Sequence, residues 1–295
     1  MDLSTLFSGY QLGRSHLNPN RYSAFYNWGF PGNYLYLIRE IFMNNLKNLI
    51  RSTLPRSIKP HRILSGYLQG EWIVTSWHDY PAAILGYTER PLIKWFSENV
   101  AFGETWLDVG AHYGYTAIAL SRLVGERGRV FAFEPMPITA GYLAQTRQKN
   151  KYSQLVVLPF GLTDEIKLKL LHLPVVRGMV DSTVNNDQVN WFETIIAIGL
   201  NQVWSSICEE NPCVDGIKID VQGMEIEVLK GMKSILMTYK PKLVIEVHQG
   251  VDRQRLLGVL GSVGYSLEGV PVEPLVGEEK AQYFDNHSYV FIKSE

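Results

Sequence analysis

The chain has little cysteine, no long apolar run and no recognisable secretion signal. Its two cysteines, Cys208 and Cys213, are too few for a disulfide framework or a cysteine-rich zinc site. No run of about 18 apolar residues is present, so the sequence predicts no transmembrane helix. The first residues lack the basic and apolar segments of a signal peptide. We therefore expect a cytoplasmic globular protein.

Charge is small in total but unevenly distributed. Residues 1–62 contain eight Lys or Arg and two acids, a net charge of +6. The rest contains 20 basic and 27 acidic residues, a net charge of −7. This asymmetry marks the N-terminal part as a separate unit. We assign residues 1–66 to a basic N-terminal segment and residues 67–295 to the catalytic domain.

The basic segment contains one amphipathic pattern, over about residues 34–53. Its apolar residues recur at helical spacing, beside three basic ones: Ile38, Phe42, Leu46, Leu49 and Ile50, with Arg39, Lys47 and Arg51. Such a helix suits peripheral contact with an anionic membrane surface. Alternatively, its apolar face packs on the catalytic domain or on the second subunit of a homodimer. The sequence leaves both hypotheses open and favours packing.

Short apolar runs alternate with helical runs in the catalytic domain. Strands are predicted at 104–109, 129–134, 155–160, 215–221 and 242–248, and helices near 115–124, 137–150, 223–239 and 253–263. This alternation predicts an α/β fold with a doubly wound, mostly parallel sheet. The lead-in, 67–100, is predicted as a hairpin over 67–85 and a helix over 89–99. The region 161–214 is predicted as an insertion, strand-like at 166–171, with a loop over the site at about 178–188.

A glycine turn separates the first predicted strand from its helix, in Asp108-Val109-Gly110-Ala111-His112-Tyr113-Gly114. Such a turn lets a ligand approach the backbone and meet the amides of the helix N-terminus. Three residues separate Gly110 and Gly114, which differs from the dinucleotide pattern and argues against a nicotinamide-dependent oxidoreductase. Glu134 follows the second strand, where a carboxylate suits the two hydroxyls of a ribose.

These elements resemble motifs I and II of the class I S-adenosylmethionine (SAM) methyltransferases. A second block, Lys218-Ile219-Asp220-Val221-Gln222-Gly223-Met224-Glu225, resembles the Lys-Ile-Asp-Val-Glu-Gly-x-Glu block of the FkbM family of SAM-dependent O-methyltransferases. Phe133-Glu134-Pro135 and the strand from Pro241 to His248 resemble it as well. The resemblance implies a Rossmann-like, seven-stranded sheet, closed by an antiparallel C-terminal strand at 289–292. It also implies SAM as cofactor and S-adenosylhomocysteine as product.

The resemblance implies roles for particular residues on the cofactor side. Asp108 and Gly110 approach the methionine part, Glu134 takes the ribose hydroxyls, and Asp164 lies near the adenine or caps a turn. Glu89 either reaches the ammonium group or starts a helix. The complete set of cofactor candidates is Glu89, Asp108, Gly110, His112, Tyr113, Gly114, Tyr115, Thr116, Glu134, Pro135 and Asp164.

The candidate catalytic residues are Asp220, Glu246 and His248, at the ends of two later strands. Methyl transfer is an in-line displacement that depends on alignment, and an alcohol acceptor must also lose a proton. Asp220 and His248 are candidates for the base or for an orienting group. The structural alternatives are that Asp220 caps the next helix and that His248 is a satisfied buried histidine. No tight ligand spacing indicates a metal, and we expect none.

The sequence thus predicts an O-methyltransferase for a hydroxyl of a sugar, glycolipid or polyketide-like metabolite. Gln222 and Asn201 replace acids of the family, which motivates an alternative, a SAM-binding scaffold without catalysis. The presence of all four acids at the predicted strand ends favours the enzyme; they are Asp108, Glu134, Asp220 and Glu246. The negatively charged domain and the absence of an Asn-Pro-Pro-Tyr motif argue against a nucleic-acid substrate.

Overall fold

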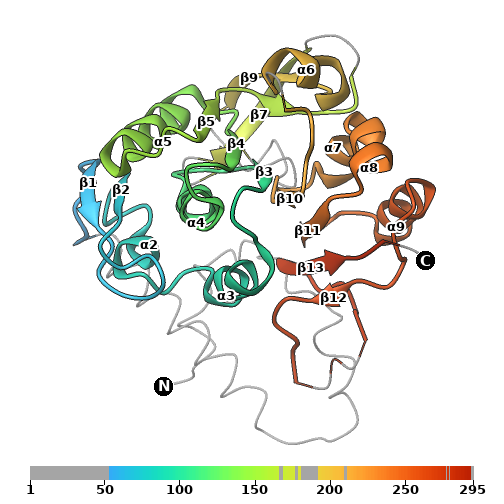
Figure 1. The fold of residues 1–295 in the computed structure, drawn as a ribbon. Coiled ribbons are helices and arrows are strands. Elements are labelled where there is room, and N and C mark those ends of the chain that lie inside the picture. Colours follow the sequence, from blue (N-terminus) through green and yellow to red (C-terminus); the bar gives the residue numbers. More distant parts are fainter. Residues whose placement is uncertain are drawn as a thin grey trace, which may run out of the picture. The chain divides into compact units, whose positions relative to one another are not determined.

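The computed structural model describes residues 53–165, 169–176, 179–180, 192–208, 211–276, 278 and 280–293 (Figure 1). The chain divides into two compact units, Met1–Leu54 and Pro55–Glu295, and the described structure is that of the second. The predicted helix over 34–53, apart from its last residue, and most of the predicted loop over 178–188 lie outside the described residues. Within the described residues, no helix is both long and apolar enough to cross a membrane.

The centre of this unit is a seven-stranded sheet in the order β12-β13-β11-β10-β3-β4-β5. Its strands are β3 (Thr105–Val109), β4 (Arg129–Phe133), β5 (Leu155–Leu158), β10 (Gly216–Ile219), β11 (Lys242–Val247), β12 (Val270–Pro271) and β13 (His287–Phe291). The five strands from β11 to β5 are parallel, and β13 is antiparallel to both β11 and β12. This arrangement confirms the predicted class I methyltransferase fold, including its antiparallel C-terminal strand.

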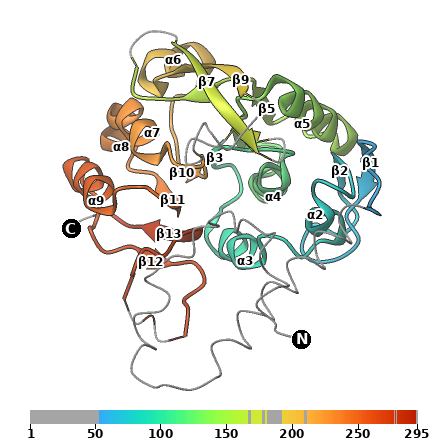
Figure 2. The ribbon, with the colours of Figure 1, turned by 180° about the vertical axis from the view of Figure 1, so that it is seen from behind.

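Helices cover both faces of this sheet (Figures 1 and 2). One face carries α3 (Arg90–Asn99), α4 (Tyr115–Val124) and α5 (Pro137–Asn150), and the other carries α7 (Glu225–Gly231), α8 (Lys233–Tyr239) and α9 (Arg253–Ser262). Alternate residues of β3 enter the two cores: Trp106 packs toward α3 and α4, and Leu107 packs toward α7 to α9. A parallel sheet buried on both faces requires such nearly continuous apolar strands.

The helices α4 and α5 have the predicted bounds, and the five parallel strands agree within about two residues. The predicted helix over 223–239 is instead two helices, α7 and α8, separated at Met232. The preceding Gly231 lies against the carbonyl of Thr163, where a Cβ would come within 1.8 Å of the oxygen.

The predicted hairpin over 67–85 is wrong. The strand β2 (Trp72–Thr75) pairs with β1 (Lys59–Arg62), which precedes it in the chain. The expected second arm is a short helix, α2 (Pro81–Leu85). Proline suits the first turn of a helix because its missing N–H has no helical acceptor there.

The region between β5 and β10 adds a second sheet, in the order β6-β9-β7-β8. It comprises β6 (Gly161–Leu162), β7 (Lys169–Val176), β8 (Met179–Val180) and β9 (Phe192–Ile198), and α6 (Leu200–Ile207) follows it. The predicted strand at 166–171 overlaps β7, whereas the sequence pattern did not indicate β9.

Candidate active site

The glycine turn after β3 has the backbone conformation that glycine favours. Gly110 has φ +83° and Gly114 has φ +94°. A Cβ on Gly110 would lie 1.8 Å from the carbonyl oxygen of Asp220, and a Cβ on Gly114 would lie 2.2 Å from Cδ1 of Leu143. Both positions therefore need glycine, for conformation and for space. The turn brings the end of β3 against the end of β10.

Glu134 lies at the end of β4 and contacts this turn. Its carboxylate accepts hydrogen bonds from the backbone amides of His112 at 2.8 Å and Met136 at 2.9 Å. Burial raises the pKa of Glu134 to about 7, although both amides favour the ionised form. An ionised carboxylate offers about four acceptor positions, so about two remain beyond those that the two amides occupy. Pro135, the next residue, is half-buried.

Asp108 and Lys218 are direct neighbours on β3 and β10 and interrupt two otherwise apolar strands. The Nζ of Lys218 lies 3.5 Å from Asp108 and 3.1 Å from Asp220, and Asp108 also accepts from the Thr116 hydroxyl at 2.6 Å. Burial alone would lower the pKa of Lys218, but Asp220, Asp108 and Glu89 raise it. Lys218 therefore remains charged and holds two strand-end acids together. It was not among the predicted site residues, although a lysine in the middle of an apolar strand is a visible signal.

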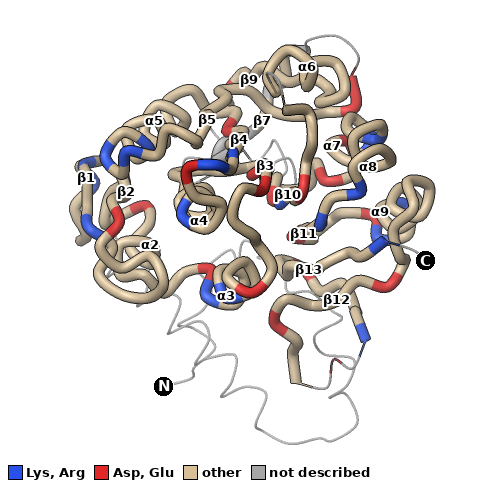
Figure 3. Tube along the Cα trace, viewed as in Figure 1, with Lys and Arg blue, Asp and Glu red and all other residues tan. Residues whose placement is uncertain are grey.

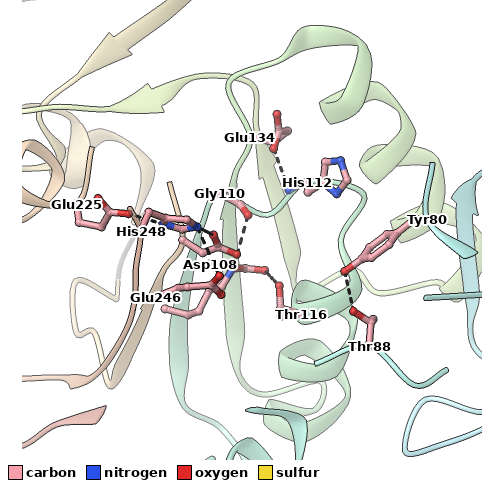
Figure 4. Close-up of polar contacts among 12 residues, drawn as sticks. Tyr80, Thr88, Asp108, Gly110, His112, Thr116, Glu134, Glu225, Glu246 and His248 are labelled. Carbon is pink, nitrogen blue, oxygen red and sulfur yellow. Dashed lines mark hydrogen bonds and ion pairs between the residues drawn. The ribbon is translucent and has the colours of Figure 1, made fainter. Parts of the chain in front are cut away.

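The three candidate catalytic residues lie together, confirming that the strand ends meet. The Nε2 of His248 lies 3.4 Å from Asp220 Oδ1 and 3.5 Å from Glu246 Oε1. On its other side, the Nδ1 of His248 lies 2.6 Å from Glu225 Oε1 (Figure 4). Glu225 is fully buried and was missed as a site residue, because its carboxylate also suits the first turn of α7.

The alternative that Asp220 caps a helix is wrong, and the alternative that His248 is a satisfied buried histidine holds for one of its two ring nitrogens. The N-terminus of α7 has Met224 at its cap position and no side-chain capping bond, and Asp220 accepts from Lys218 instead. Asp220 is therefore not a helix cap. His248 is buried, but only its Nδ1 has a hydrogen-bond partner among the described residues.

The pKa values of these groups shift in different directions. Burial raises the pKa of Glu246 to about 8, and the charge of Asp220 adds to this. Burial also opposes ionisation of Asp220, but Lys218 and His248 lower its pKa overall. The pKa of His248 is raised, since Glu225, Asp220 and Glu246 together outweigh burial. Neighbouring carboxyls with opposite shifts are typical of sites that move protons. Figure 3 shows acidic residues gathered beside β3 and β10.

Glu89 faces the same charges from the start of α3. It has φ +52° and makes no side-chain capping bond. Burial raises its pKa, and the carboxylates of Asp220 and Asp108 raise it further. The alternative that Glu89 starts a helix agrees with its position, since it is the N-cap residue of α3, although its side chain makes no capping bond. Its role toward a cofactor stays a prediction.

Aromatic residues surround the turn on the α2 side. The ring of Tyr80 lies 5.5 Å from that of His112 (Figure 4). It also lies 6.3 Å from the ring of Tyr113 and 6.4 Å from that of Tyr115. Burial lowers the pKa of His112 to about 4, so this imidazole is neutral. The Tyr113 hydroxyl lies 3.4 Å from Asp79. Tyr80 was not predicted, because nothing in its local sequence links it to the glycine turn.

Asp164 has partners other than the residues at the strand ends. It follows β6, lies 3.8 Å from Lys230 of α7, and is exposed. Its proposed place near an adenine stays a prediction. On the opposite side of the site, Glu246 lines an open pocket of about 340 Å³, together with Glu89, Glu273 and His287.

One family model and one curated protein match the chain. Residues 108–267 match the family model described as "Methyltransferase FkbM domain". The curated hexuronic acid methyltransferase AglP of Haloferax volcanii is 26% identical over 181 residues, 61% of this chain and 71% of AglP.

Solved methyltransferases are similar at lower identity. An FkbM methyltransferase from Methylobacillus flagellatus has 18% identity and a TM-score of 0.43, and the match covers 67% of this chain and 50% of that one. Aeropyrum pernix fibrillarin, solved with natively bound S-adenosyl-L-methionine, has 13% identity and a TM-score of 0.43, covering 80% and 88%. The family model spans more than half of the chain, and this protein therefore belongs to the FkbM family of SAM-dependent methyltransferases.

Proposed function

We propose that the protein transfers the methyl group of SAM to a hydroxyl of a sugar, in a glycan or a small glycoside. The observation that carries this proposal is the meeting of the glycine turn with the Asp220–Glu246–His248 group. Methyl transfer needs a binding place for the donor beside groups that can take the proton of the acceptor oxygen. The glycine turn suits the first role, and the Asp220–Glu246–His248 group suits the second. The curated relative acts, by its name, on a hexuronic acid, which supports a sugar as the acceptor.

On the donor side, Glu134 would hold the ribose hydroxyls and the first turn of α4 would meet the carboxylate of the methionine part. The first amides of a helix lack acceptors within the helix and favour an anion. Asp108 and Glu89 would face the ammonium group, because both carboxylates lie near the turn and near each other. Tyr80, His112 and Tyr113 would border the cofactor with apolar ring surface. SAM supplies the activated methyl group on its sulfonium.

On the acceptor side, the reaction balances without a further reactant. The O–H bond of the acceptor breaks, and the oxygen electron pair forms the new O–CH₃ bond. The S–CH₃ bond breaks with its electrons remaining on sulfur, which yields S-adenosylhomocysteine and releases one proton. Asp220, Glu246 and His248 would receive the acceptor oxygen and stabilise the loss of its proton.

The charge of the pocket favours a hydroxyl over a carboxylate as the methylated group. Glu89, Glu246 and Glu273 all line it, and the raised pKa values of Glu89 and Glu246 indicate that further negative charge is disfavoured there. A carboxylate is also already ionised at neutral pH and needs no group to take its proton.

The test uses purified protein, SAM with a deuterated methyl group, and a panel of neutral, amino and uronic acid glycosides. Mass spectrometry before and after mild alkali separates a stable methyl ether from a labile methyl ester. We expect an alkali-stable label on a neutral or amino sugar. An alkali-labile label on the uronic acid would replace the hydroxyl with a carboxyl acceptor, and label on neither class would reject a sugar acceptor.

A further inference from the structure

Three ligand-type atoms face one point at the ends of β10 and β11. They are Oδ1 of Asp220, Oε1 of Glu246 and Nε2 of His248, and they lie within 4.8 Å of one another. Ligand bonds of about 2.0–2.2 Å at a tetrahedral angle would place neighbouring ligand atoms roughly 3.4 Å apart. The two separations from His248, 3.4 and 3.5 Å, agree with this value.

The histidine of this group is held in an orientation that suits a metal ligand. Its Nδ1 lies 2.6 Å from Glu225, whose carboxylate is fully buried and also accepts from the amide of Gly223 at 3.2 Å. When His248 is neutral and its Nδ1 donates to Glu225, Nε2 carries the lone pair. His248 is only 2% exposed, and its Nε2 has no hydrogen-bond partner in the described part of the chain. A carboxylate behind the imidazole is the usual second partner of a metal-bound histidine.

The surrounding charges leave the group short of positive charge. Lys218 contacts Asp220 through the other carboxylate oxygen, Oδ2, and is shared with Asp108. Among the described residues, the carboxylates of Glu246 and Glu225 both pair with the side chain of His248. Glu89 adds a further carboxylate through the pocket that Glu246 lines. A buried excess of negative charge is costly unless a cation compensates it.

We propose that Asp220, Glu246 and His248 bind one divalent cation, of the Mn²⁺ or Zn²⁺ type. Two carboxylates with one imidazole combine the oxygen ligands that suit Mn²⁺ with the nitrogen ligand that suits Zn²⁺. Three protein ligands leave open positions, and one of the three, Glu246, lines the open pocket. The use of this cation in catalysis rests on the proposed function: it would stabilise the acceptor oxygen as its O–H bond breaks. The spacing of these residues in the sequence did not indicate a metal, because the site joins Asp220 after β10 to Glu246 and His248 at the end of β11.

The test measures Mn²⁺ binding to full-length, untagged protein that has been stripped with EDTA and dialysed. Electron paramagnetic resonance reports free Mn²⁺ during the titration, and elemental analysis measures zinc in the protein as purified. We expect one Mn²⁺ per chain and at least 10-fold weaker binding in His248→Ala. Glu225→Gln should weaken binding about 10–100-fold, the range for partners of metal ligands. The control is His78→Ala, because His78 also pairs with a carboxylate, that of Asp79 at 3.0 Å. This variant should bind Mn²⁺ as tightly as the wild type.

If His248→Ala does not fold, Glu246→Gln serves instead, because its side chain is partly exposed. The absence of stoichiometric Mn²⁺ and zinc in the wild type, or unchanged binding in these variants, would overturn the cation site. Full methyl transfer by metal-free protein would overturn its catalytic use while leaving the proposed function intact. Stoichiometric binding without transfer to any sugar would support the cation site and count against the proposed function.

Discussion

A Cβ on residue 110 would overlap the carbonyl oxygen of Asp220, at a distance of 1.8 Å. The cofactor turn and the end of β10 are therefore in direct contact, and the absence of a side chain at Gly110 permits it. Lys218 reinforces the same contact, since its Nζ lies 3.5 Å from the carbonyl oxygen of Gly110 and 3.1 Å from Asp220.

Gly110→Ala should damage this contact, and Gly250→Ala provides a matched control. The two glycines have φ +83° and +84°, but a Cβ on Gly250 meets no atom within 4 Å. A left-handed alanine costs about 1–2 kcal/mol, so Gly250→Ala should lose about that much stability. Gly110→Ala should lose more and also bind SAM more weakly. Urea unfolding and calorimetry measure both effects, and equal losses in the two variants would contradict the steric argument.

Lys218→Met should be strongly destabilising. It leaves the fully buried carboxylate of Asp108 without its cation and removes one partner of the partly exposed Asp220, and breaking a buried pair costs about 3–5 kcal/mol. Lys242→Met removes a partly exposed lysine from its pair with Glu104 and should cost about 0–1 kcal/mol. Chemical denaturation of both variants gives the two values. A small loss for Lys218→Met would show that the strand-end acids do not need it.

Cofactor affinity should depend on pH through Glu134. Its carboxylate accepts hydroxyl hydrogens most strongly when ionised, and its pKa of about 7 means that SAM binding weakens as pH falls below 7. The nearest charges, Asp108 and Lys218, act on this pKa in opposite directions. Glu134→Ala should weaken binding by about 1–3 kcal/mol at pH 8. Because the folded pKa is raised, the ionised form also costs folding stability as pH rises through 7.

Calorimetry of SAM binding between pH 5.5 and 8.5 tests this, with Glu134→Gln as a variant that cannot ionise. The pH dependence should be clearly smaller in that variant, with Glu89 as the remaining titrating carboxyl beside the cofactor. A wild-type profile that is flat over this range would place the ribose elsewhere.

The basic segment should act as a unit distinct from the methyltransferase domain, whichever surface it contacts. Arg39, Lys47 and Arg51 flank its apolar pattern, so replacing all three by glutamate reverses its charge. A membrane-binding helix would cosediment with anionic vesicles and lose this property in the triple variant. The favoured hypothesis, packing on the protein, predicts no cosedimentation with anionic or neutral vesicles. Size-exclusion chromatography on the same samples reports any dimer, and cosedimentation of the wild type alone would reject the packing hypothesis.

The sequence predicted the central sheet well because its signals are local. Each parallel strand is a short apolar run, and Gly110 and Gly114 mark the turn into α4. The lead-in was mispredicted because strand pairing is not local. The strand β2 pairs with β1, which precedes it in the chain. The side chain of Asn150 in α5 accepts from the backbone N–H of Trp72 and donates to its carbonyl, each at 2.7 Å.

The candidate site was predicted by residue type but not by contact. Asp220, Glu246 and His248 were identified as strand-end residues, and the topology brought them together. Lys218 and Glu225 were not predicted as site residues, because their partners lie on other elements. Lys218 lies beside Asp108 of β3, and Glu225 contacts His248, which follows β11. A cation site built from two strands has no sequence spacing that would reveal it.

The central claim is that the Asp220–Glu246–His248 group and the glycine turn form one methyl-transfer site. The most direct test measures the rate at which Asp220→Asn converts SAM with a deuterated methyl group to a labelled methyl ether. The wild type and His78→Ala are measured beside it. Asp220→Asn should fold and bind SAM normally, yet turn over roughly 10²-fold or more slowly, while His78→Ala matches the wild type. Normal turnover in Asp220→Asn with an intact fold would contradict the account.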